Sequence, residues 1–404
     1  MGMENDVPSG QSANDSGLAA FAGLRIIEVG SWLAVPNATA MFADLGAEVL
    51  KIESGGGDPV RRFPQSMRGD DVSSAAFAML NRNKKSLVLD LHEPVDRARF
   101  EKLLGTADAL VNNLRPAQIS RLGLDAGDLA SRYPRLIIAS LTGLGLRGPD
   151  ADNGGFDVGA FWARSGFLSQ VTQDGSEPAA LTGGYGDLMT SLALYAAIVS
   201  GLLERASTGR GGLVETSLLQ TAAFAISGDL VSHQAYGRVP RARPRLKSRT
   251  PLNNSYRTAD GRWFFLTCVD AMQHVPGLTK ALGRPELSED PRFASPRSIG
   301  ENAAAIISLL DEVFGSHPLS LWAERFAAEG VTWERVAFPD EVLADPQVAA
   351  NEMTSEWRWD STSLQGVPAP FSIFRTKRAT AAAAPALGAD NALLAEDAPN
   401  NCKG

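Results

Sequence analysis

The first third of the chain alternates short, β-branched apolar runs with longer segments that have the period of a helix. Residues 24–29 (Leu-Arg-Ile-Ile-Glu-Val) predict a strand that ends at Gly30. Residues 36–45 predict a helix, with Gly46 in the position typical of a helix C-terminus. Residues 47–53 predict a second strand. A strand, a helix and a strand within thirty residues form a βαβ unit, which implies a parallel sheet.

The same pattern continues beyond this unit. Further strands are predicted at 86–91, 109–112, 136–141 and 213–216, and further helices at 95–104, 188–203 and 218–227. A glycine-rich turn precedes the long helix at 188–203. This order of elements predicts an α/β fold with a Rossmann-like parallel sheet in a large domain.

The composition changes between residues 236 and 254, where six basic side chains and three prolines gather, and this predicts an exposed linker. Residues 255–258 and 263–269 then flank an Ala-Asp-Gly-Arg turn, which predicts a β-hairpin. Helical patterns follow to about residue 330. We therefore expect a smaller α+β domain with its linker at 229–330, a large domain made of 21–228 and 331–404, and a disordered lead-in at 1–20.

Composition excludes several classes of protein. Apolar residues make up 44% of the 404 positions, so the chain can bury sizeable cores, but no uninterrupted apolar run reaches the ~20 residues of a membrane helix. The polar N-terminus lacks the features of a signal peptide, so we expect a cytoplasmic protein without a membrane partner. The net charge of −8 argues against nucleic-acid binding.

Metal and disulfide chemistry are not expected either. The two cysteines, Cys268 and Cys402, form no disulfide framework and no metal-binding pattern. The four histidines, at positions 92, 233, 274 and 317, are widely separated and have no ligand spacing between them.

The loop after the first strand raises the possibility of a dinucleotide site. Glu53 ends the second strand about where such folds place the acid that binds ribose. The loop itself, residues 30–35 (Gly-Ser-Trp-Leu-Ala-Val), lacks the second and third glycines of the fingerprint, and Trp32 would crowd a pyrophosphate. A nicotinamide-dependent oxidoreductase is therefore only a distant alternative.

Asp187 stands in the run Gly-Gly-Tyr-Gly-Asp-Leu at 183–188, directly before the predicted long helix. One interpretation is that Asp187 is the helix N-cap, a role that aspartate serves well. The other is that it is a covalent nucleophile: glycines let a substrate approach the backbone, and free N–H groups at a helix N-terminus can stabilise an oxyanion. The residues alone leave both open.

Two other groups have a structural and a functional interpretation. The aromatic residues Phe156, Phe161, Trp162 and Phe167 are expected to pack in a core, with an acyl pocket as the alternative. The basic cluster between 238 and 249 is expected to be solvated rather than to bind phosphate.

Taken together, ordered motifs along nearly the whole chain, from about residue 24 to 396, resemble those of the class III CoA-transferases, the family of formyl-CoA transferase and of the carnitine and bile-acid CoA-transferases. The motifs that carry the resemblance are residues 42–53, 81–86 (Asn-Arg-Asn-Lys-Lys-Ser), 89–91, 113–116 (Asn-Leu-Arg-Pro), 121–123, 142–145, 148–149, 186–187, 208–211 and 384–388.

The resemblance implies a function and a site. It implies that Asp187 attacks an acyl-CoA carbonyl, that a mixed anhydride and then an aspartyl-CoA thioester form, and that a carboxylic acid acceptor takes over the CoA. Acyl-CoA would be a substrate rather than a tightly bound cofactor, the large domain would bind it, and an interlaced homodimer is expected. Asp187 should be ionised at neutral pH. The residues implied to contact CoA are Leu33, Ala34, Leu89, Asp90, Leu91, His92, Asn113, Leu114, Arg115, Arg121, Thr142, Gly143, Leu144 and Gly145, of which the two arginines suit phosphate.

The chain also departs from the family pattern. His92 stands where a lysine is common, Ser54 stands where one branch has arginine, and the glycine-run loop of the formyl-CoA branch is absent between 236 and 262. These departures put formyl-CoA and oxalate in doubt as substrates, and the segment 156–166 is closer to the carnitine, bile-acid and aryl-acid branches.

Three alternatives remain beside CoA transfer between two acids. α-Methylacyl-CoA racemases of the same fold use a histidine in a Gly-His-Asp run, but this chain has Phe156 in that place, which cannot take a proton. Intramolecular CoA transfer needs the same aspartate and stays open. A catalytically silent CoA-binding protein is the third. The residues do not identify the donor thioester or the acceptor acid.

Overall fold

The computed structural model describes residues 19–62, 74–179, 181, 183–238, 241–373 and 382–396. The chain divides into two compact units. The first contains the chain up to residue 167 together with 181–231 and the part from 349 onward, and the second contains 168–180 and 232–348.

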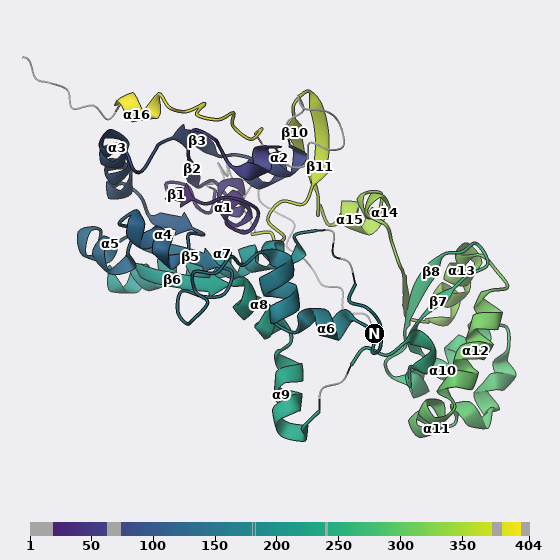
Figure 1. The fold of residues 1–404 in the computed structure, drawn as a ribbon. Helices are drawn as coiled ribbons and strands as arrows, with labels where there is room; N and C mark the ends of the chain where they lie inside the picture. Colours follow the sequence, from purple (N-terminus) through teal and green to yellow (C-terminus); the bar gives the residue numbers. More distant parts are fainter. Residues whose placement is uncertain are drawn as a thin grey trace, which may run out of the picture. The chain divides into compact units, whose positions relative to one another are not determined.

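A six-stranded parallel sheet forms the centre of the first unit (Figure 1). Its strand order is β3-β2-β1-β4-β5-β6, so the Rossmann-like parallel sheet predicted from the sequence is confirmed. Because β1 neighbours both β2 and β4, the strand order reverses between β1 and β4. The strands are β1 (Arg25–Val29), β2 (Glu48–Glu53), β3 (Lys85–Val88), β4 (Ala109–Asn112), β5 (Ile137–Thr142) and β6 (Gly212–Ser217).

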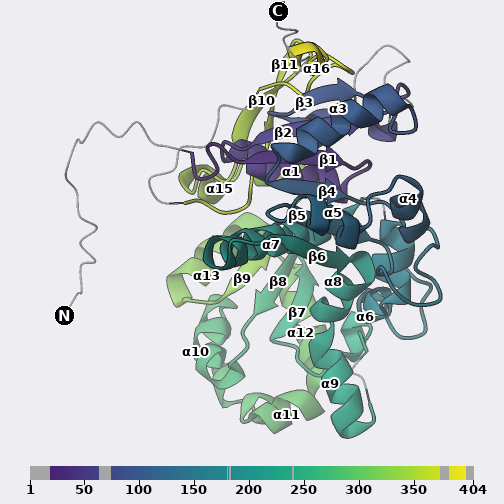
Figure 2. The ribbon, with the colours of Figure 1, turned by 90° about the vertical axis from the view of Figure 1, so that its left-hand side faces the viewer.

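Alternate residues of these strands face two layers of helices. Ile26, paired with Val49 and Ala109, faces α1 (Ala34–Asp44) and α7 (Tyr185–Thr208), which lie side by side (Figure 2). The next residues along each strand, such as Ile27 and Leu110, pack against α3 (Pro94–Gly105) and α5 (Ala126–Arg132). Both faces are covered by helices, which explains why β1, β2, β4 and β5 contain consecutive buried residues rather than an alternation of buried and exposed ones.

Helix α7 is 24 residues long and apolar enough, by length and hydropathy alone, to cross a bilayer. Leu194 and Ile198 of α7, however, are fully buried in the core between α1 and the sheet. These contacts are those of a core helix in an α/β fold. The helix ends at Gly209, which takes the left-handed conformation (φ 74°) favoured by glycine at this position.

Shorter elements connect the strands and complete the first unit. They are η1 (Pro59–Arg62), α2 (Ala75–Asn81), α4 (Pro116–Arg121), the π-helix η3 (Asp157–Arg164), α6 (Phe167–Val171), α8 (Leu218–Ala225), α9 (Ser227–Tyr236), the hairpin β10 (Ser355–Trp359) and β11 (Thr362–Gly366), and α16 (Leu393–Glu396). Two of them, α6 and α9, continue into the second unit. Just before α16 the chain lies along β3, where the backbone N–H groups of Ser86 and Val88 donate to the side chains of Asp390 and Asn391 (Figure 1).

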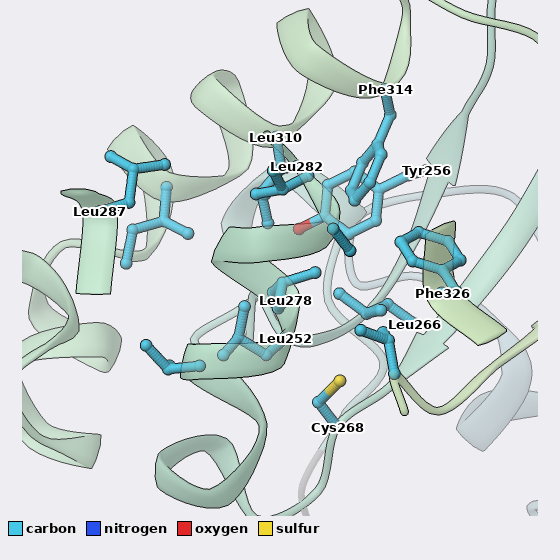
Figure 3. Packing of buried hydrophobic residues seen from close by; sticks show 14 of the residues in the cluster. Leu252, Tyr256, Leu266, Cys268, Leu278, Leu282, Leu287, Leu310, Phe314 and Phe326 are labelled. Carbon is cyan, nitrogen blue, oxygen red and sulfur yellow. The ribbon is translucent and has the colours of Figure 1, made fainter. Parts of the chain in front are cut away.

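The second unit has its own sheet and core. The antiparallel strands β7 (Asn253–Arg257) and β8 (Trp263–Thr267) confirm the predicted hairpin, and β9 (Trp333–Arg335) adds a third strand. Tyr256 and Phe314 pack together in the core, which also buries Cys268 (Figure 3). The ring of Phe264 contacts both aromatic rings. The helices of this region are η4 (Arg245–Lys247), α10 (Ala271–Ala281), η5 (Pro285–Glu289), η6 (Pro291–Phe293), α11 (Pro296–Glu301), α12 (Ala303–Phe314), α13 (Leu319–Glu329), α14 (Pro339–Leu343) and α15 (Pro346–Ala350).

Two features of the second unit differ from the sequence analysis. β9 pairs with β8, so the unit continues to residue 348 and the predicted boundary at 330 falls inside it. The described part of the predicted linker is also tied to this unit, because Arg245 forms an ion pair with Asp311 at 2.7 Å and Leu252 is buried. Most of the predicted lead-in at 1–20 lies outside the described residues.

Candidate active site

Asp187 lies in the first turn of α7 rather than before it. The helix begins at Tyr185, and Gly184 is its N-cap, so Asp187 is the third helical residue. The interpretation of Asp187 as an N-cap is therefore wrong. The sequence placed the helix start three residues late because Tyr-Gly-Asp carries no apolar periodicity and glycine is a poor helix former.

The capping carboxylate comes from another element. Asp157, the first residue of η3, is buried, and its Oδ1 accepts the backbone N–H of Asp187 at 2.9 Å. The N–H of Gly186 donates to the same side chain. These two donors of the first turn are thus already satisfied. The expectation that free N–H groups here would stabilise an oxyanion is wrong for Gly186 and Asp187.

The glycines around Asp187 permit this close packing. A Cβ on Gly186 would lie 2.3 Å from Oδ1 of Asp157 and 2.3 Å from Cγ of Phe161. A Cβ on Gly184 would lie 2.4 Å from Cδ2 of Leu33, which comes from the loop after β1. Glycine at both positions lets the start of α7 approach η3 and the β1 loop within contact distance.

The two aspartates influence each other's ionisation. Burial raises the pKa of Asp187, and the neighbouring charge of Asp157 raises it further, to about 7. Burial also raises the pKa of Asp157, although the N–H groups of Asp187 and Gly186 partly offset this. With a pKa close to neutrality, Asp187 is partly protonated at neutral pH. This differs from the full ionisation expected from the sequence.

Asp187 faces a cavity of about 600 Å³ in the first unit. Its walls come from the loops at the carboxyl ends of β1, β4 and β5, next to the point where the strand order reverses. Ligands of open α/β sheets bind at this position. The lining residues are Ser31, Trp32, Leu33, Ala34, Asn113, Leu114, Arg115, Gln118, Leu141, Thr142, Gly143, Ala151, Asn153, Gly154, Gly155, Phe156, Asp157, Val158, Leu181, Gly183, Gly184, Asp187 and Leu218.

The structure brings together eight of the fifteen residues that the sequence analysis assigned to the site. Leu33, Ala34, Asn113, Leu114, Arg115, Thr142, Gly143 and Asp187 all line the cavity. The remaining seven do not. Leu89, Asp90, Leu91 and His92 follow β3 at the edge of the sheet, Arg121 is exposed in the last turn of α4, and Leu144 and Gly145 follow the lining part of the β5 loop.

Asn113 and Arg115 shape the cavity from the β4 side. Asn113 fixes the β1 loop, because its Oδ1 accepts the N–H of Ser31 at 3.2 Å and its Nδ2 donates to the Ser31 carbonyl at 2.8 Å. Arg115 is exposed, and its Nη1 donates to the carbonyl of Asp152 at 3.1 Å. Arg115 is the one cationic side chain among the described residues that line the cavity.

Trp32 has a backbone conformation that is rare for a bulky residue. Its φ is +67°, in the left-handed region, which costs roughly 1–2 kcal/mol for a residue other than glycine. A buried ion network holds it there: Asp58 accepts the Trp32 N–H at 3.3 Å and pairs with Lys51 at 2.9 Å, and Lys51 pairs with Glu28 at 2.6 Å. Burial alone would raise the pKa of Glu28, but Lys51 and a second buried lysine hold it at about 2.

The four aromatic residues singled out in the sequence separate into two groups. Phe161, Trp162 and Phe167 pack on one another and on α8, which confirms the expected core role. Phe156 is 65% exposed and lines the cavity, where its ring lies 5.8 Å from that of Trp32 at an angle of 83°.

Glu53, the acid that a dinucleotide site would use to bind ribose, is engaged within the protein. Glu53 is buried at the end of β2, pairs with Arg61 at 2.6 Å and accepts the Ser86 hydroxyl at 2.6 Å. Both of its oxygens are thus engaged within the protein. The carboxylate that sequence reasoning did not assign to the site is Asp157, and its only signal was the run Gly-Phe-Asp at 155–157.

The chain matches a family model described as CoA-transferase family III over residues 21–391. It is 29% identical over 342 residues to the (R)-2-hydroxy-4-methylpentanoate CoA-transferase of Clostridioides difficile, with 84% of this chain and 85% of that enzyme covered. It is 30% identical over 393 residues to the succinate–glutarate CoA-transferase of Agrobacterium fabrum, with 93% and 95% covered. Among solved structures, a CaiB/BaiF family protein from Brucella suis superposes with a TM-score of 0.80 at 26% identity, covering 93% of this chain and 98% of that one.

Proposed function

The chain belongs to CoA-transferase family III, and we propose that it transfers CoA between an acyl-CoA and a carboxylic acid through covalent intermediates on Asp187. The observation that carries the proposal is the position of Asp187. It is a partly buried carboxylate in the wall of the cavity, next to the point where the strand order reverses, and ligands of this fold bind at that point.

The proposed reaction has four steps, and each step is a nucleophilic substitution at a carbonyl carbon. The Asp187 carboxylate attacks the thioester carbon, the C–S bond breaks, and a mixed anhydride and CoA thiolate form. The thiolate attacks the Asp187 carbonyl of the anhydride, releases the first acid and leaves an aspartyl-CoA thioester. The acceptor carboxylate attacks the carbonyl carbon of this thioester, the C–S bond breaks, and a second anhydride and CoA thiolate form. The thiolate then attacks the acceptor's carbonyl, which releases the new acyl-CoA and regenerates Asp187.

The surroundings of Asp187 suit this role. Partial burial leaves the carboxylate poorly solvated, which makes its ionised form a better nucleophile than an exposed aspartate. Asp157 fixes the backbone of Asp187 by its 2.9 Å hydrogen bond, so the side chain starts from a defined position on the first turn of α7. Asp157 is in this proposal a positioning residue.

CoA would enter along the loops that follow β1 and β4. Leu33, Ala34, Asn113 and Leu114 offer backbone and side-chain contacts in the cavity wall, and Arg115 offers the cation for a phosphate. We retain His92 and its neighbours after β3, and Arg121, as candidate contacts for the far end of CoA, on the strength of the family resemblance alone. The same resemblance supports a homodimer.

Trapping the intermediates tests the proposal. Acyl-CoA added without an acceptor should leave aspartyl-CoA thioester or acyl-aspartyl anhydride on the protein. Hydroxylamine would convert either species to a hydroxamate on Asp187, which peptide mass spectrometry locates. Asp187→Asn should bind CoA and lose transfer by at least about a thousandfold, since a neutral amide is a poor nucleophile. A mark on a different carboxylate, or transfer retained in this variant, would contradict the proposal.

The racemase alternative predicts a different isotope result. Racemisation exchanges the α-proton of the acyl group with solvent, and that requires a base beside the α-carbon. None of the four histidines lines the cavity, and Phe156 occupies the histidine position of the racemase run. We therefore expect no α-deuterium uptake from heavy water during turnover, and substitution of each histidine should change the rate by less than about tenfold.

A further inference from the structure

The cavity contains an aromatic pair that the CoA-transfer chemistry does not itself require. Trp32 is 37% exposed and Phe156 is 65% exposed, and the two rings meet edge to face. Both line the cavity of Asp187. Exposed aromatic faces that converge in a concave site are typical of contacts with an apolar part of a ligand.

The backbone at Trp32 is strained, and a buried network supports the strained conformation. A glycine would adopt φ +67° at almost no cost, whereas tryptophan is held there by the hydrogen bond to Asp58 and by the buried pair of Asp58 with Lys51. Strain that is stabilised by a buried network clusters at binding and catalytic sites. The strained loop directs the tryptophan ring to Phe156.

The rest of the wall is mainly apolar, with several neutral polar side chains and two carboxylates. Leu33, Leu141, Val158, Leu181 and Leu218 contribute apolar surface to the cavity. Arg115 is the single cation among the described lining residues, and the carboxylates of Asp157 and Asp187 lie in the same wall. A second carboxylate on a substrate would find two like charges there and would compete with CoA phosphate for one arginine.

We infer that Trp32 and Phe156 form the subsite for the acyl group, and that its substrates are monocarboxylic acids with an apolar, preferably aromatic, side chain. This inference rests on the proposed function, since the same cavity must hold the thioester beside Asp187. Some of the similar enzymes are named for a branched apolar acid and others for dicarboxylic acids. The inference favours the apolar acids for this chain.

Hydroxylamine trapping with different thioesters tests the subsite without an acceptor. The probes are 3-phenylpropanoyl-CoA, butyryl-CoA and succinyl-CoA, and the readout is the initial rate of hydroxamate formation on Asp187. We expect the phenylpropanoyl thioester to react at least about tenfold faster than the succinyl thioester at limiting concentration. In Trp32→Gly and in Phe156→Ala this preference should fall about 10- to 100-fold.

Two matched variants serve as controls. Trp263→Leu removes a tryptophan of the second unit with 40% exposure, and Phe224→Ala removes a phenylalanine of α8 with 80% exposure, and neither lines the cavity. Both should keep the wild-type preference. Trp32→Gly should fold, because glycine adopts φ +67° without strain.

The outcomes distinguish failure of the proposed function from failure of the proposed acyl subsite. If no thioester marks Asp187, the proposed function is wrong, whatever the selectivity. If succinyl-CoA marks Asp187 as fast as the phenylpropanoyl thioester, or if both cavity variants keep the wild-type preference within twofold, the function stands and the subsite is overturned. Loss of selectivity in Phe156→Ala alone, should Trp32→Gly not fold, still supports the subsite, because Phe156 is mostly exposed.

Discussion

The backbone N–H of Asp187 donates to Oδ1 of Asp157 across 2.9 Å, so a carboxylate thirty residues earlier in the chain fixes the start of the helix that carries Asp187. This arrangement has two opposite consequences. The hydrogen bond stabilises the first turn of α7. The charge of Asp157, added to burial, raises the pKa of Asp187 to about 7, which reduces the fraction of nucleophile at neutral pH.

The first prediction is a rate that rises with pH. Only the ionised form of Asp187 attacks a thioester, so kcat/KM should increase about tenfold per pH unit on the acid side and level off above the pKa of about 7. Steady-state rates with a single acyl-CoA and acid between pH 5 and 9 measure this profile. A rate that stays flat down to pH 5 would show that ionisation of Asp187 does not limit the reaction.

Asp157→Asn should move that profile to lower pH. The amide oxygen can still accept the N–H of Asp187, but the neighbouring negative charge is gone, so the pKa of Asp187 should fall. Burial remains, and the pKa should therefore stay above the ordinary value for aspartate. Asp174→Asn in the second unit changes the net charge equally and should leave the profile in place. Equal profiles for Asp157→Asn and the wild type would remove Asp157 from the electrostatics of the site.

Asp187→Asn should stabilise the fold at high pH. The folded pKa of Asp187 is raised above its unfolded value, so the folded protein binds more protons between about pH 4 and 7 and loses stability as pH rises through that window. The variant lacks this loss and should be more stable than the wild type by about 1–3 kcal/mol at pH 8. The carboxylate also favours the helix N-terminus by about 0.5 kcal/mol, which is the smaller effect.

Urea unfolding of both proteins at pH 4 and pH 8 checks this prediction, because titration of the other groups cancels in the difference. At pH 4 the two free energies of unfolding should agree closely. A variant that is less stable than the wild type at pH 8 would mean that the Asp187 carboxylate is well accommodated in the fold.

Gly186→Ala should destabilise the protein. The new Cβ would overlap Oδ1 of Asp157 and the ring of Phe161, each 2.3 Å away, and the backbone of the first turn must shift to relieve both contacts. Overpacking of this kind costs about 1–3 kcal/mol. Gly228→Ala is the matched control, because it lies in α9 with nothing within 4 Å of its Cβ and should be neutral or slightly stabilising. Thermal unfolding of the two variants provides the comparison, and equal melting temperatures would contradict the overlap.

The sequence predicted the sheet well because each strand is a local signal. The runs at 24–29 and 47–53 contain adjacent apolar residues, which face opposite sides of the sheet, and β1 and β2 lie within these runs. A short strand has no comparable run of apolar residues. β9 has only three residues, and its pairing with β8, rather than its own sequence, determines that it is a strand.

The site was only partly predictable, since its key contacts join distant residues. The resemblance to a family identified Asp187, but the cap from Asp157 comes from thirty residues away and has no local signature. The contact between Trp32 and Phe156 likewise depends on how the β1 loop meets the segment before η3. Trp32 entered the sequence analysis only as an obstacle to dinucleotide binding, because nothing local reveals that Asp58 holds it in the left-handed region.

The last prediction separates two arginines that the family resemblance treated alike. Arg115 lines the cavity at the start of α4, whereas Arg121 is exposed at the other end of the same helix and does not line the cavity. If CoA phosphate binds at the cavity, Arg115→Ala should weaken CoA binding about tenfold at low salt and Arg121→Ala should weaken it by less than about threefold. Arg115→Lys keeps the charge but loses the planar fork, so its affinity for CoA should fall between those of the wild type and Arg115→Ala.

Calorimetric titration with CoA at low and high salt measures the affinity of all three variants, and the loss in Arg115→Ala should shrink as salt screens the phosphate. The melting temperature of each variant is compared with that of the wild type, because Arg115 also has a structural position at the start of α4. An equal loss in the two alanine variants would place the phosphate along α4 rather than at the mouth of the cavity, and no loss in either would remove both arginines from the binding of CoA.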